Sequence, residues 1–104
     1  MQHYPALQLV EYLKLHQPHL IDVREPWEFK ICRLDNSELL PMGQVPTSLK
    51  MFHESPEYVI IYHHGIRSLQ VINFLAHHGI HNTINLDGGV DAWARDFDVT
   101  MDLY

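Results

Sequence analysis

The sequence predicts an α/β fold, in which an open, mainly parallel β-sheet carries helices on both faces. Short apolar segments alternate along the 104 residues with segments whose apolar residues recur at helical spacing. The apolar segments show little alternation of polarity, which is typical of strands buried on both faces of a parallel sheet. Because the chain is short and has no internal repeat or linker, a single domain over residues 1–104 is expected.

The first half of the chain predicts two helices, each followed by a strand. Pro5 suits the opening position of the first helix, and Pro18 ends it. Trp27 and Ile31 mark one face of the second helix, and Trp27 is expected to be buried in the core. The expected elements are a helix over 5–16, a strand over 19–23, a helix over 25–31 and a short strand over 38–42.

The second half predicts two further strands and the helices that follow them. The strand over 58–61 has the clearest signal, because it is β-branched, apolar and bounded by turn residues. The helix after it should turn Val71, Ile72 and Leu75 inward and end at Gly79 as a left-handed cap. The remaining expected elements are a short helix over 45–52, a strand over 83–86, a turn at Asp87-Gly88-Gly89 with unusual backbone angles, and a helix over 90–95 with Trp93 buried.

The segment Tyr62-His63-His64-Gly65-Ile66-Arg67-Ser68 is expected to turn sharply from a strand into a helix. Such a turn presents backbone N–H groups, the positive end of the helix dipole and an arginine around one small space, which favours anion binding. Two further polar segments, 22–25 and 87–89, should reach the same carboxyl edge of the sheet. The candidates for a cleft wall beside the turn are Asp22, Arg24, Gly88 and Gly89.

Several of these residues also have a structural interpretation. Arg67 either binds an anion or braces the turn through hydrogen bonds, and the ring of Tyr62 can fill the space itself. A buried ion-pair bracket that ties the strand end to the next helix is the preferred interpretation of Asp22, Arg24 and Glu28. Both alternatives for Arg67 stay open.

The composition argues against several classes of function. Seven basic and 13 acidic residues give a net charge of −6 without a basic cluster, which is not the pattern of a nucleic-acid-binding protein. No segment is long and apolar enough to span a membrane, the first residues do not resemble a signal peptide, and the single cysteine fits a reducing compartment, so a cytoplasmic location is expected. The nine histidines lack the spacing of a metal site, so no metal and no cofactor are expected. A metal-handling or purely structural protein is kept as an alternative.

Three segments together resemble the rhodanese-like sulfurtransferase domains. Residues 20–29 (LIDVREPWEF) resemble the first signature of that family, residues 62–68 (YHHGIRS) its active loop C-x-x-G-x-R-S, and residues 86–93 (LDGGVDAW) its terminal L-x-G-G-x-x-A-W. The order and spacing resemble those of the short, single-domain bacterial members. The resemblance implies an α/β sheet of about five strands. It also implies a family activity in which the loop cysteine carries sulfur as a persulfide from a donor such as thiosulfate.

This resemblance places a tyrosine at the position of the family's nucleophile. Gly65, Arg67 and Ser68 match the glycine, arginine and serine of the active loop, but Tyr62 falls on the cysteine, and a phenol has no sulfur to carry. The resemblance therefore implies an inactive member that acts as a binding or regulatory module. Its partner would be an unknown protein or a small anion such as sulfate or thiosulfate, and its oligomeric state is left open.

Cys32 offers the alternative of an active sulfurtransferase that uses this thiol or the thiol of a partner protein. The helix that begins at Pro26 is expected to run back from the carboxyl ends of the strands. Seven residues at about 1.5 Å each would then place Cys32 on the order of 10 Å away along the helix axis. We therefore expect a half-buried cysteine at the edge of the sheet opposite the loop.

Overall fold

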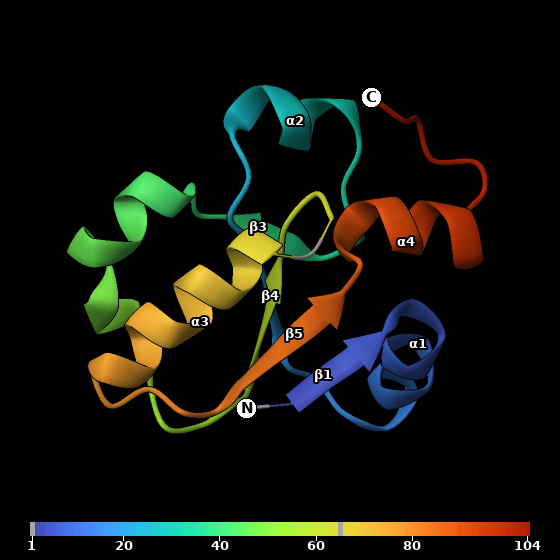
Figure 1. Cartoon of the computed structure of the whole chain (residues 1–104). Helices are drawn as coiled ribbons and strands as arrows, with labels where there is room; N and C mark the ends of the chain where they lie inside the picture. The colour runs from blue at the N-terminus through green and yellow to red at the C-terminus, as the bar shows by residue number, and fades with distance from the viewer. Residues whose placement is uncertain (1, 65) are drawn as a thin grey trace.

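A computed structural model describes residues 2–64 and 66–104 and has the expected α/β architecture (Figure 1). Its five strands form one sheet in the order β1-β5-β4-β2-β3, and every pairing between neighbouring strands is parallel. No helix in the described part of the chain is long and apolar enough to cross a membrane. The elements in chain order are β1 (Gln2–Pro5), α1 (Ala6–Leu15), β2 (His19–Asp22), α2 (Pro26–Ile31), β3 (Ser37–Leu39), two 3₁₀ helices (Met42–Thr47 and Leu49–Met51), β4 (Tyr58–Ile61), α3 (Ile66–His77), β5 (Thr83–Asp87) and α4 (Gly89–Asp96).

Helices cover both faces of the sheet. Successive side chains on a strand point to opposite faces, so each strand contributes to a core on either side. On the central strand β4, Val59 and Ile61 join the core that lies under α1 and α4. Tyr58 and Ile60 join the core on the other face, under α3 and the 3₁₀ helices. All four residues are buried, which explains why this strand reads as a continuous apolar run.

The helix α3 buries the face that the sequence predicted and ends as expected. Val71, Ile72 and Leu75 are all buried on its inner side. Gly79 has a positive φ of 84°. The N–H of Ile80 bonds to the carbonyl of Leu75 at 3.0 Å, so Gly79 is the left-handed residue of a C-terminal cap.

Three elements differ from the prediction. The strand β1 was not expected, because its residues are exposed or half-buried and carry no apolar signal. The segment expected as one helix over 45–52 forms two 3₁₀ helices instead, since Pro46 lies inside the first and has no N–H for an α-helical bond. The strand expected over 38–42 is the shorter β3, which ends at Leu39 shortly before Pro41.

The helix α2 turns the opposite face inward from the one predicted. The side chain of Trp27 is 59% exposed and that of Ile31 is 38% exposed, so the expectation of a core Trp27 was wrong. The one buried residue of α2 is the charged Glu28. A buried polar network, described below, therefore orients this helix more strongly than its apolar side chains do.

The turn between β5 and α4 has the unusual backbone that the sequence predicted. Gly88 and Gly89 have φ angles of 79° and 62°, in the left-handed region that favours glycine. At Gly89 a Cβ atom would lie 2.3 Å from the carbonyl oxygen of Tyr62. The missing side chain thus lets the start of α4 approach the backbone of the loop that follows β4.

Replacing Gly89 with alanine should destabilise the protein by at least about 2 kcal/mol. The alanine would have to adopt a strained positive φ, and its Cβ atom would overlap the carbonyl oxygen of Tyr62. The free energy of unfolding in urea measures the effect. Gly43→Ala is the matched control, since its Cβ would meet nothing within 4 Å. Equal stabilities for the two variants would contradict the close approach.

Candidate functional site

The candidate site is the loop over residues 62–68, which joins the carboxyl end of β4 to the start of α3. A hollow of about 370 Å³ lies beside it. Gly65, predicted as the loop glycine, lies outside the described residues. The hollow is lined by Tyr62, His63, His64, Ile66, Arg67 and Gln70. The structure therefore brings together five of the seven loop residues predicted from the sequence.

The N-terminus of α4 holds the backbone of this loop. The N–H of Val90 donates to the carbonyl of Tyr62 at 2.8 Å, and the N–H of Asp91 donates to the carbonyl of His63 at 2.9 Å. Unpaired N–H groups of a helix start need acceptors, and here the loop supplies them. Because these bonds involve only main-chain atoms, they hold the loop whatever side chain stands at position 62.

Ser68 anchors the start of α3 to the sheet instead of lining the hollow. It is fully buried, and its hydroxyl donates to Oδ1 of Asn85 on β5 at 2.5 Å. The amide nitrogen of Asn85 lies 3.3 Å from Nδ1 of His3 on β1. The closing serine of the loop thus has a positioning role in this structure.

Arg67 and Tyr62 contact each other at the hollow. The ring of Tyr62 is half-buried and packs against the core under α3. The guanidinium carbon of Arg67 lies 6.0 Å from the centroid of that ring, at the limit of a cation–π contact. Within the described residues, the exposed Arg67 side chain forms no ion pair and no hydrogen bond. It therefore makes no bracing hydrogen bond to a described residue of the loop, and its charge stays available at the hollow.

A second group of residues forms a buried network behind the loop, centred on Arg24. The carboxylate of Asp22 binds its Nε at 3.0 and 3.1 Å and its Nη2 at 2.8 Å. The guanidinium also donates to the carbonyl of Cys32 at 2.6 Å and to the hydroxyl of Tyr104 at 2.9 Å. Burial alone would lower the pKa of Arg24, but the bonds to Asp22 and Tyr104 outweigh burial and raise it, so the cation is permanent.

This network is the bracket that the sequence analysis preferred. Asp22 and Arg24 are both fully buried, and Glu28 is 7% exposed. None of the four residues expected in a cleft wall lines the hollow beside the loop. Asp22 and Arg24 lie in the buried network and not at the hollow. Gly88 and Gly89 form the backbone turn that brings α4 to the loop.

Tyr104 is the residue that the sequence analysis missed. Its hydroxyl donates to Oε2 of Glu28 at 2.8 Å, and its ring stacks on the ring of His63 with centroids 4.2 Å apart. Burial raises the pKa of the Tyr104 phenol, and the bond to Glu28 adds to this against the opposing effect of Arg24. The residue carries no local sequence signal, because Arg24 is 80 positions away from it.

Cys32 lies at the carboxyl edge of the sheet, where the loop also lies. The prediction that it lies at the opposite edge was wrong. Its Sγ is 3.8 Å from Nη1 of Arg24, and its carbonyl oxygen binds the same guanidinium. The side chain is buried, with 8% exposed, instead of half-buried. The helix α2 does not run back along the sheet, because Arg24 draws both Glu28 and Cys32 to the end of β2.

The histidines of the loop form a stack. The rings of His63 and His64 have centroids 4.4 Å apart, and His63 lies between His64 and Tyr104. Burial, and secondly the charge of His64, lower the pKa of His63. The described residues contain no group of three His, Cys, Asp or Glu side chains placed to hold a metal ion.

Replacing Tyr104 with phenylalanine should destabilise the protein by about 1–3 kcal/mol, since it leaves Arg24 and Glu28 each short of a buried hydrogen bond. Thermal and urea unfolding measure the change. The control is Tyr4→Phe, which removes an exposed hydroxyl bond to Gln2 and should stay within about 0.5 kcal/mol. Similar losses in the two variants would show that the Tyr104 hydroxyl has no special role.

The pKa of His63 should lie below 6.5 in a proton NMR titration of its ring. In the unfolded chain this residue binds its proton at about pH 6.5, whereas the folded chain binds it only at a lower pH. The stability that the fold gains from keeping this ring neutral is therefore fully present above about pH 6.5. The contribution is lost as the pH falls from about 6.5 to the lower folded pKa. Tyr104→Ala removes the ring that covers His63 and should raise its pKa, whereas an unchanged pKa in that variant would refute the stacking as its cause.

Comparison with known proteins agrees with this architecture. The family model of the rhodanese-like domain matches residues 6–96. A putative sulfurtransferase of Bacillus subtilis (strain 168), YtwF, is 35% identical over 75 residues, which cover 72% of this chain and 72% of that protein. The thiosulfate sulfurtransferase GlpE of Vibrio cholerae is 30% identical over 83 residues, covering 76% of this chain and 74% of the relative. The crystal structure of a rhodanese-like domain protein from Staphylococcus aureus has a TM-score of 0.84 at 28% identity, and the match covers 100% of this chain and 99% of that one. The chain belongs to the family of rhodanese-like domains.

Proposed function

We propose that this chain is a rhodanese-like module that binds a small oxyanion at its loop without carrying sulfur itself. The observation that carries the proposal is the tyrosine at position 62, where the loop pattern of the family has its cysteine. A persulfide needs a sulfur nucleophile, and a phenol oxygen cannot form one. The sulfurtransferase names of the relatives therefore describe a chemistry for which this loop has no thiol.

The oxyanion part of the proposal rests on the positive groups around the hollow. Arg67 is exposed there and has no ion-pair partner among the described residues, and the N-terminus of α3 adds the positive end of its dipole. A sulfate or thiosulfate ion would have this guanidinium as its counter-charge. The binding should be weak, because no covalent bond anchors the ion.

A second candidate is an active sulfurtransferase that uses Cys32. One observation favours it, since Nη1 of Arg24 lies 3.8 Å from the sulfur of Cys32 and places a positive charge beside it. Burial opposes it, because a donor such as thiosulfate has to reach the sulfur and Cys32 is only 8% exposed. We therefore rank this candidate second. For either function we place the protein in the cytoplasm, where its single cysteine would stay reduced.

The discriminating experiment is transfer of sulfur from thiosulfate to cyanide, followed as thiocyanate. The natural chain should show no turnover above the uncatalysed rate, and Cys32→Ser should behave in the same way. Tyr62→Cys should gain slow turnover, because the main-chain bonds from Val90 and Asp91 do not depend on the side chain at 62. Turnover by the natural chain that disappears in Cys32→Ser would overturn the proposal in favour of the second candidate.

The oxyanion is tested on the same natural chain by titration with thiosulfate and with sulfate, observed through backbone amide NMR shifts. Saturable shifts should appear in the loop and should be lost in Arg67→Gln. Arg95→Gln is the matched control, since Arg95 is an exposed arginine on α4 that pairs with Asp91 and Asp96. Loop shifts that survive in Arg67→Gln would contradict the assigned role of Arg67.

A further inference from the structure

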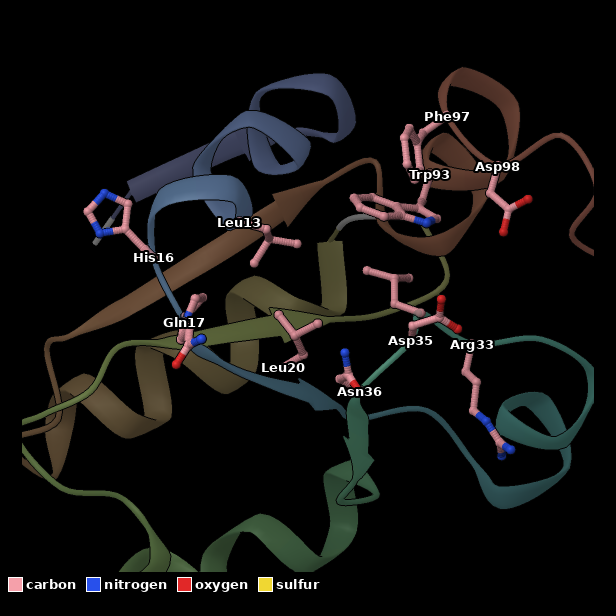
Figure 2. A pocket seen from close by; sticks show the side chains of 12 residues that line it. Leu13, His16, Gln17, Leu20, Arg33, Asp35, Asn36, Trp93, Phe97 and Asp98 are labelled. Atoms are coloured by element: carbon pink, nitrogen blue, oxygen red, sulfur yellow. The ribbon is translucent and has the colours of Figure 1, made fainter.

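A larger hollow, of about 480 Å³, lies away from the 62–68 loop (Figure 2). It opens between the C-terminal ends of α1 and α4 and the segment that joins α2 to β3. None of the described loop residues lines it. Its volume falls in the range of about 300–1,000 Å³ that is typical of pockets for small molecules.

The floor and one wall of this hollow are apolar. Leu20 and Leu34 form the floor, and both are buried members of the core under α1 and α4. The rings of Trp93 and Phe97 form the wall, with centroids 4.8 Å apart and an interplanar angle of 62°. Phe97 is 50% exposed, so the wall offers an aromatic surface to a ligand.

The indole N–H of Trp93 is a polar donor without an acceptor among the described residues. Trp93 is only 7% exposed, yet its ring nitrogen forms no hydrogen bond within that part of the chain. Figure 2 shows this nitrogen on the side of the ring that faces Asp98 and the 33–36 segment. No buried side-chain nitrogen or oxygen of the described residues lacks a hydrogen-bond partner, so this N–H is open to the hollow, where a ligand oxygen can accept its bond.

The charge at the rim is negative and uncompensated. Asp35 and Asp98 both line the hollow, and neither forms an ion pair within the described part of the chain. Asp98 accepts two hydrogen bonds from Thr100, both at Oδ1. The only basic residue of fixed charge in the described lining, Arg33, places its guanidinium over the ring of Phe29 at 4.7 Å, and Figure 2 shows it pointing away from the hollow.

We propose that this hollow binds a small organic amine with an apolar body and one oxygen acceptor. The ammonium group would pair with Asp35 and Asp98, and the apolar body would lie against Trp93 and Phe97, where the aromatic faces also attract a cation. The oxygen would accept the bond from the Trp93 indole N–H. This site shares no residue with the oxyanion hollow and does not depend on the function proposed for it.

The test uses the full chain and ¹⁵N NMR of the indole N–H groups, with tyramine as the probe. The chain has two tryptophans, so Trp27→Phe leaves Trp93 as the only indole signal. Tyramine should shift that signal saturably. The acid of similar size, 3-(4-hydroxyphenyl)propionate, should not, because it brings a carboxylate to Asp35 and Asp98. Phenethylamine, which lacks the oxygen, should bind with a smaller shift of the Trp93 signal.

Two substitutions decide whether the carboxylates act as proposed. Asp98→Asn and Asp35→Asn should each weaken tyramine binding by about two- to fivefold, as expected for a partly exposed ion pair. The amide that Asp98→Asn introduces keeps an Oδ1 acceptor for Thr100, so the fold of this variant should be intact. Asp96→Asn is the control, since Asp96 lies outside the hollow and pairs with Arg95. No saturable shift with tyramine, equal binding of the acid, or equal affinities in all three variants would overturn the proposal.

Discussion

A buried guanidinium holds the region behind the loop together. Removing such a charge from water costs several kcal/mol, so Arg24 can be buried only where its N–H groups find acceptors. Asp22, the carbonyl of Cys32 and the hydroxyl of Tyr104 supply them. These acceptors come from the end of β2, the end of α2 and the segment after α4. One cation therefore joins three segments, of which the segment after α4 is 80 positions away in the sequence, and it explains why α2 buries Glu28 and exposes its tryptophan.

The loop itself depends on contacts of a different kind. Its carbonyl groups are bound by the N–H groups at the start of α4, and its last residue, Ser68, is bonded to the sheet through Asn85. Neither contact involves the side chain at position 62. The contacts that hold this loop are therefore independent of the side chain at position 62. The family name alone therefore does not establish turnover.

The parts predicted from the sequence are those with a local signal. The strand β4 is a continuous apolar run, and Gly79 and the glycines of the 87–89 turn stand where positive φ angles require them. The loop and the ion-pair bracket were placed because they follow strands that were themselves predicted. Three features had no such signal: β1 has no buried residue, the orientation of α2 is set by partners elsewhere in the chain, and Tyr104 meets Arg24 across 80 positions. Non-local polar contacts decided these features, and apolar periodicity cannot report them.

The helix α4 connects the two hollows of the molecule. Its first N–H groups bind the carbonyls of Tyr62 and His63, and Trp93, one turn further along, lines the larger hollow. Eight residues at about 1.5 Å each make a helix of about 12 Å, short enough to move as a rigid unit. A ligand beside Trp93 touches no described residue of the loop, so it can influence the loop only by displacing this helix. Such coupling requires two positions of α4 with different affinities for the ligand. The close fit of Gly89 against the Tyr62 carbonyl leaves little room for a second position, which favours two independent sites.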